Sequence, residues 1–411
     1  MNYVILIGIA LFFVLTAVRD GAMGWDFNNS SMNFRIGDGD YSLRVKSSGD
    51  VDLEPDGSGV ASLDRGGSLD VSMRSNGVDR RALYTSADGT IERKFFVEGD
   101  EQPWGPEADR FVAEVMPIVL RETAINADER VAWLIDNRGQ DGLLDEIALI
   151  KSDFAQRVYS VQYAHTTTIA PADLERLMKL TADNMSSDFD VRTTLIEVYD
   201  AQMPTGAAFD ALLGAGETIS SDFDARLVLE HVGPSMPRSP EAATAYIDMA
   251  RTISSDFDMR LALQPLITST DSDDELVARA IDLAGTDISS DFDLRSVLTD
   301  AAAGRVGRSD TLARAYTTAA HSISSDFDLR IALTALANGA ELTPEGWRML
   351  LTTARDISSD FDAATLLAEV APKLPRDDTV LQAYRETLDS IGSDFDRGRA
   401  AAALEGVRRQ R

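Results

Sequence analysis

An acidic string, SSDFD, recurs along this chain at an almost constant spacing, and no other feature limits its possible folds as strongly. Seven close copies follow a degenerate one, KSDFAQR, at 151–157. A period this regular, in the range of about 20 to 50 residues, is typical of stacked structural repeats. We therefore predict that residues 151–411 form an α-solenoid. The phenylalanines of the eight copies lie 34 or 35 residues apart, at Phe154, Phe189, Phe223, Phe257, Phe292, Phe327, Phe361 and Phe395.

Each repeat is predicted to contain two helices. The first begins at the acidic string, because apolar residues stand two, six and nine positions after the phenylalanine, on one helical face. The second has starts of its own at SPE 239–241 and TPE 343–345, where a hydroxyl N-cap precedes a proline. The expected fold class is α+β, ending in a right-handed solenoid of helix pairs 34 to 35 residues long. The sixth position is leucine in six consecutive repeats: Leu195, Leu229, Leu263, Leu298, Leu333 and Leu367.

The serines and aspartates of the string have the signature of a helix start. In ISSDFDLR at 323–330, Ser325 is predicted to cap the helix, with Asp328 returning the bond as in a capping box. Asp326 is expected to pair with Arg330 four positions on, a pairing that is lost at Ala364 and Gly398. The phenylalanine is expected to pack as a knob between neighbouring repeats. The predicted cap residues are Ser187, Asp190, Ser221, Asp224, Ser255, Asp258, Ser290, Asp293, Ser325, Asp328, Ser359 and Asp362.

A competing hypothesis makes the aspartates ligands. Stacked repeats would align their carboxylates into an acidic stripe that could hold Ca²⁺ or a basic partner. Two arguments favour the structural role. Carboxylates used in caps and ion pairs have little coordination left for a cation that takes six to eight oxygens. A feature written into every repeat also serves what every repeat shares, which is stacking, so recognition is expected where the copies differ, at 201–216, 233–238, 268–275 and 303–310.

The N-terminal segment, 1–20, is predicted to be a membrane anchor or signal segment. Residues 3–18 form a charge-free apolar run that would reach about 24 Å as a helix, slightly less than a hydrocarbon core of about 30 Å. Small residues do not stand where a signal cleavage site needs them, so an uncleaved anchor is favoured. We expect the bulk of the chain to be extracytoplasmic, or periplasmic. Arg19 after the run leans toward the opposite orientation, so the cytoplasmic face stays open.

Residues 24–104 are predicted to be a small all-β domain of six to eight strands. Apolar residues alternate with polar ones in short runs, and Gly, Asn and Asp separate the runs as turns. From Pro106 the apolar period becomes helical, which predicts a helical adaptor over 105–150.

Composition excludes several classes of function. The net charge of −29 repels phosphate backbones, so no nucleic-acid partner is expected. The chain has no cysteine, and its three histidines, His165, His231 and His321, lack metal-site spacing. Phosphate-binding, dinucleotide and nucleophile-elbow motifs do not occur. Paired carboxylates stay possible, since the 68 acidic residues single out no pair. We therefore assign no catalytic, cofactor-binding or metal residue and expect no cofactor.

The SDFD-R strings, the Gly- and Asp-rich module before them and the adaptor ending in LLDEIALIKSDF resemble uncharacterised bacterial proteins with an N-terminal membrane segment. They are also similar to modules that trail metallopeptidases of the β-lactam-sensor type, although no peptidase motif exists here. The helix pairs resemble those of HEAT and TPR solenoids. From the repeat architecture and the missing catalytic motifs we predict a non-catalytic, membrane-anchored scaffold that binds a protein partner. The alternative is a degenerate hydrolase, or an accessory subunit of an envelope enzyme, with a site in the β domain.

Overall fold

A computed structural model describes residues 24–28, 31–38, 41–87, 90–269, 272–304, 306–339 and 342–410. The chain divides into two compact units, Met1–Asp190 and Val191–Arg411. The predicted anchor at 1–20 lies outside the described residues. Among the helices that are described, none is long and apolar enough to cross a membrane.

The first unit begins with an antiparallel sheet, as the period-two pattern predicts. Seven strands lie in the order β1-β2-β3-β6-β7-β8-β9, and β4 and β5 form a separate hairpin. Asn76 and Gly77, both with positive φ, make the two-residue turn between β6 and β7. The strands are β1 (Gly24–Asn28), β2 (Ser31–Asp38), β3 (Tyr41–Ser48), β4 (Val51–Leu53), β5 (Val60–Leu63), β6 (Ser68–Ser75), β7 (Val78–Ala87), β8 (Thr90–Val97) and β9 (Asp100–Gln102).

The first helix, α1 (Pro106–Thr123), completes the core of the sheet. Its apolar stripe, which includes Phe111 and Val115, is buried together with alternate strand residues such as Phe34 and Val71. The division predicted at 104/105 therefore does not separate two cores. The apolar face of a sheet must be covered by another element, and α1 covers it here. The domain is α+β rather than all-β.

Three further helices complete the first unit: α2 (Ala127–Ile147), α3 (Asp153–Thr166) and α4 (Pro171–Asn184). The chain leaves helical geometry at Gly139, whose φ is 70°. At the start of α2, the Asn126 side chain accepts the backbone N–H of Leu53 at 2.9 Å, and Arg130 donates to the Pro55 carbonyl at 2.6 Å. Arg130 is buried against Glu146, with 3.2 Å between nitrogen and oxygen. These contacts fasten the β4–β5 hairpin to the helices.

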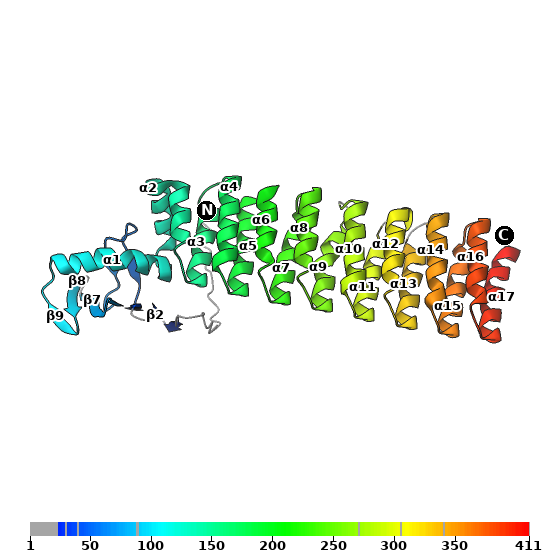
Figure 1. Cartoon of the computed structure of the whole chain (residues 1–411), viewed down its shortest axis with the longest axis horizontal. Coiled ribbons are helices and arrows are strands. Elements are labelled where there is room, and N and C mark those ends of the chain that lie inside the picture. Colours follow the sequence, from blue (N-terminus) through cyan, green and yellow to red (C-terminus); the bar gives the residue numbers. More distant parts are fainter. Residues whose placement is uncertain are drawn as a thin grey trace. The chain divides into compact units, whose positions relative to one another are not determined.

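The second unit is an array of helix pairs that stand in chain order (Figure 1). The boundary between the two compact units falls inside α5 (Asp188–Gln202). In the first unit, Tyr159 of α3 is buried and donates to the Leu120 carbonyl of α1 at 3.1 Å. The other helices are α6 (Ala207–Gly216), α7 (Asp222–Val232), α8 (Pro240–Ala250), α9 (Asp256–Thr268), α10 (Asp274–Asp287), α11 (Asp291–Ala302), α12 (Asp310–Ala320), α13 (Asp326–Gly339), α14 (Pro344–Thr353), α15 (Asp360–Val370), α16 (Asp378–Asp389) and α17 (Asp394–Gln410), with 3₁₀ turns at Gly233–Ser235, Val306–Arg308, Ala354–Asp356 and Ala371–Lys373.

The core of the array lies where the sequence pattern predicts it. The six leucines at the sixth position after each phenylalanine are fully buried, and so are the residues at the second and ninth positions. Second helices add buried tyrosines, and the Tyr316 hydroxyl donates to the Ala332 carbonyl of the next helix at 2.7 Å. Ser239 and Thr343 cap α8 and α14 ahead of their prolines. The predicted helix-pair period is confirmed.

Candidate interaction surface

The second serine of each string caps the first helix of its repeat. Ser325 Oγ accepts the backbone N–H of Asp328 at 3.2 Å, and this satisfies one of the four amides that a helix start leaves without partners. The same bond, at 3.2 to 3.3 Å, is made by Ser187, Ser221, Ser255, Ser290 and Ser359.

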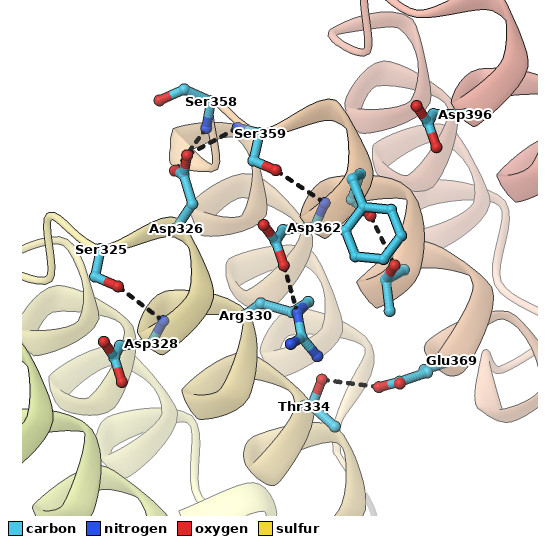
Figure 2. A network of polar contacts seen from close by, with 12 residues as sticks. Ser325, Asp326, Asp328, Arg330, Thr334, Ser358, Ser359, Asp362, Glu369 and Asp396 are labelled. Carbon is cyan, nitrogen blue, oxygen red and sulfur yellow. Dashed lines mark hydrogen bonds and ion pairs between the residues drawn. The ribbon is translucent and has the colours of Figure 1, made fainter.

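The bond that a capping box returns to the serine amide does not come from the same repeat. The Ser325 N–H donates to the first aspartate of the preceding repeat, Asp291, at 2.8 Å. Asp291 also accepts the Ser324 N–H at 3.1 Å and the Ser324 hydroxyl at 2.9 Å. Figure 2 shows the equivalent contact of Asp326 with Ser358 and Ser359. The carboxylate of one repeat thus fixes the helix start of the next, as it also does for Asp153, Asp222, Asp256 and Asp360.

The arginine of the string also reaches into the next repeat. Arg330 pairs with Asp362 at 2.8 Å, not with Asp326 in its own helix (Figure 2). The predicted four-residue pairing is therefore wrong, because Asp326 is already used by the serine amides of the next repeat. The distances between repeats are 2.6 Å for Arg157–Asp190, 2.5 Å for Arg192–Asp224, 2.7 Å for Arg226–Asp258, 3.0 Å for Arg260–Asp293 and 3.1 Å for Arg295–Asp328.

We call these two contacts between neighbouring repeats the clasp. In one contact, the first aspartate of a string accepts the two serine amides of the next string. In the other, the arginine of a string pairs with the second aspartate of the next string. The paired arginine and aspartate side chains are 12 to 21% exposed, so water screens them less than it screens surface pairs. The clasp joins helices whose sequence positions differ by one period. Each repeat therefore helps to set the position of the next.

The clasp of the first repeat begins from a residue outside the strings. Glu122, at the end of α1, accepts the backbone N–H groups of Lys151 and Ser152 at 3.1 Å. It occupies the role that the first aspartate has in later repeats. Burial raises the pKa of Glu122 above its ordinary value, and the two amide bonds and the nearby Arg121 oppose that rise.

At the C-terminal end, a different arginine makes up for one that is missing. Ala364 stands where six of the other seven strings have arginine, so Asp396 receives nothing from the preceding helix at that position. Arg399 of α17 pairs with Asp396 at 3.3 Å and reaches back to the Phe361 carbonyl at 3.0 Å. Its guanidinium carbon lies 5.0 Å from the centre of the Phe361 ring. A polar link across this interface is kept, but its arginine comes from the later repeat instead of the earlier one.

The phenylalanines do not pack between repeats. Phe189, Phe223, Phe257, Phe292, Phe327 and Phe361 are 51 to 60% exposed, and Phe395 is 80% exposed. In four of these strings the arginine of the same string lies over the ring, with 5.0 Å to the ring centre for Arg226 on Phe223 and 4.8 Å for Arg295 on Phe292. The predicted knob is wrong. We call these seven side chains the ring row.

The periodicity already contained a signal for this exposure. At about 100° per residue, core positions two, six and nine after the phenylalanine centre about 150° away from it on the helical wheel. The ring must then lie opposite the core. Glu122 and Arg399 gave no such signal, because neither belongs to a string, and only the three-dimensional contacts bring them to the clasp.

Outside the strings, the described residues hold histidine–aspartate pairs and a surface depression. No group of three or more His, Asp or Glu side chains with metal-binding geometry occurs in the part of the chain that the structure describes. His231 pairs with Asp200 at 2.7 Å, and His321 pairs with Asp356. A depression of about 240 Å³ between α8 and α10 is lined by Ile247, Arg251, Arg279, Asp282, Leu283 and Thr286, and burial raises the pKa of Asp282. Its walls hold no nucleophile next to a base.

No protein-family model, curated protein or solved structure matches this chain.

Proposed function

We propose that this protein is a non-catalytic scaffold, anchored in a membrane through residues 3–18, that presents a right-handed α-solenoid to a protein partner. The observation that carries the proposal is the clasp, repeated from one helix pair to the next. It keeps successive first helices in the same relation to each other, so any group on their outer face recurs at the same interval. Such a surface suits an elongated partner better than a small substrate.

The chemistry of the strings supports a role in binding rather than in reaction. The first aspartates accept backbone amides and the second aspartates accept arginines, so these carboxylates already have partners. The resemblance to membrane-anchored bacterial proteins with SDFD-R repeats supports the anchor and an extracytoplasmic position. The proposal places the sheet domain between the anchor and the array along the chain.

Membrane fractionation of cells that produce the full chain tests the anchor. We expect the protein to stay in the membrane pellet after alkaline extraction, and to move to the supernatant when Leu11→Arg places a charge in the apolar run. Leu11→Ile is the matched control and should stay in the pellet. An unchanged distribution of Leu11→Arg would contradict anchoring through this segment.

In-cell cross-linking tests the scaffold. A photo-reactive residue at Leu227 or Leu261, in the array and outside the clasp, should give one reproducible protein adduct, whereas the same residue at Asp100 in the sheet domain should not. Adducts from Asp100 alone would favour the alternative, an accessory or degenerate hydrolase domain with its site in the sheet.

A further inference from the structure

The ring row is the part of the string that the clasp leaves over. The serines, aspartates and arginine of a string all have partners in their own or a neighbouring repeat, whereas about half of each phenylalanine surface meets solvent. A large exposed aromatic repeated on neighbouring helices is uncommon on soluble proteins outside interaction sites. The kind of partner that this row would take is inferred from its chemistry, and the inference rests on the proposed scaffold function.

Shielding an arginine from water does not by itself explain why each string has a phenylalanine. Phe395 has Gly398 where its arginine would stand, and among the contacts of the described residues no guanidinium lies over it. The ring is nevertheless present, and it is 80% exposed.

The side chains one turn after the rings extend this surface. Leu227, Leu261 and Ile331 are half-buried four positions after their phenylalanines, on the same helical face. In other repeats this position holds a hydroxyl, as with Thr365, whose hydroxyl donates to the Phe361 carbonyl at 2.7 Å. The surface is therefore apolar at the rings, and the residue one turn after each ring differs between repeats.

The interval of the row fits one backbone conformation. Neighbouring first helices are in direct contact through the clasp, and packed helices lie about 8 to 10 Å apart. A polyproline II segment advances about 3.1 Å per residue with three residues per turn, or about 9.3 Å per turn. One turn of such a segment therefore corresponds to one repeat, and its equivalent side chains would meet successive rings. Proline-rich segments bind aromatic surfaces in this way, with a low cost in conformational entropy.

The charge around the ring row determines whether a partner must be acidic or basic. Each of the seven strings after the degenerate one has two aspartates and at most one arginine, so each leaves at least one net negative charge beside its ring. The chain as a whole has a net charge of −29. A segment that lies along the rings therefore needs basic side chains between its apolar ones.

We propose that the ring row binds an extended, polyproline II-type polypeptide segment that presents one apolar residue per turn to each phenylalanine and basic residues to the aspartates beside it. Five rings, from Phe223 to Phe361, would take about fifteen residues of such a segment, at three residues per turn.

Fluorescence anisotropy with synthetic peptides tests this proposal on the full chain. The probe is fluorescein-labelled (Pro-Pro-Arg)5, and (Gly-Gly-Arg)5 carries the same charges at the same interval without proline. The variant combines Phe257→Ser, Phe292→Ser and Phe327→Ser. The matched control is Met203→Ser, which removes a side chain that is 54% exposed and lies outside the row. Thermal melting by circular dichroism checks folding, and the single change Phe292→Ser serves if the triple variant melts early.

We expect (Pro-Pro-Arg)5 to bind at least tenfold more tightly than (Gly-Gly-Arg)5. The triple variant should weaken that binding at least tenfold and Phe292→Ser about two- to threefold, while Met203→Ser changes it less than twofold. Equal binding of both peptides, or undiminished binding by the ring variants, would overturn the proposal. So would ring-dependent self-association in sedimentation velocity that excludes the peptide, since the occupant would then be a second copy.

The two proposals fail separately. If the ring variants keep the cross-linked partner and the peptide affinity, the ring row is wrong and the scaffold stands. If no partner is cross-linked although the rings bind the peptide, the scaffold is wrong and the site stands.

Discussion

Replacing Asp291 by alanine removes one carboxylate from the middle of the array and tests the clasp directly. Asp291 accepts the backbone N–H groups of Ser324 and Ser325 at 3.1 and 2.8 Å and the Ser324 hydroxyl at 2.9 Å. It also lies in the first turn of α11, where the helix dipole favours a negative charge. The substitution leaves the Ser324 and Ser325 amides without this acceptor, whereas the Ser325 cap on Asp328 is kept.

The expected loss is about 2 to 4 kcal/mol. A hydrogen bond to a charged group contributes about 1.5 to 3 kcal/mol when it is buried. Ser325 is partly buried and loses most of that amount, whereas Ser324 is exposed and its amide turns to water. The dipole adds about 0.3 to 1 kcal/mol. Asp291→Asn keeps one acceptor oxygen and should lose about half as much.

Amide hydrogen exchange by mass spectrometry measures the effect at the site, because repeat arrays open locally rather than all at once. Exchange at Ser324 and Ser325 should become about 30- to 1,000-fold faster, at about 1.4 kcal/mol for each factor of ten. The matched control is Asp287→Ala, which removes the same charge from an exposed site four residues earlier. If exchange at Ser325 in the two variants agreed within about twofold, the clasp would not stabilise this helix start.

Three further predictions concern other parts of the chain. Arg399→Ala should speed amide exchange in α17, because it removes the pair with Asp396. Adding Ala364→Arg to Arg399→Ala should restore protection, and no gain in the combined variant would count against the compensation. Because burial raises the pKa of Glu122, the folded state holds its proton more tightly than the unfolded state does. In urea titrations, the free energy of unfolding of the natural chain should therefore fall relative to Glu122→Gln as pH rises above 4.5, the ordinary carboxyl value. A constant difference would contradict the raised pKa. Tyr316→Phe removes the bond to the Ala332 carbonyl and should lower the free energy of unfolding by about 0.5 to 1.5 kcal/mol, and no change in the urea midpoint would show that this bond adds nothing.

The helix pairs and their core follow from the sequence because they depend on local patterns. Apolar residues at two, six and nine positions after the phenylalanine determine the buried face, and Leu298 and Leu333 are fully buried as a result. A serine three residues before an aspartate determines the cap, which needs only the residues of one turn.

The clasp does not follow in the same way because it is not local. From the sequence alone, Asp326 could bond either Arg330 in its own helix or the serines one period later. The spacing within one string does not show which partner it takes. Stacking decides, since it brings the unpaired amides of the next helix start within reach of the carboxylate. The exposed rings could have been predicted from the helical wheel, whereas α1 as the cover of the sheet required the tertiary core.

A double-mutant cycle tests whether the polar side chains of a string bond to the neighbouring repeat and not within their own repeat. The pair between repeats is Arg295 with Asp328, at 3.1 Å, and the pair within a repeat is Asp291 with Arg295. Alanine at each position, singly and in pairs, gives the coupling free energy from amide exchange in α11 and α13. We predict a coupling of about 0.5 to 1.5 kcal/mol for Arg295–Asp328 and near zero for Asp291–Arg295. The reverse order would contradict this account of the repeat.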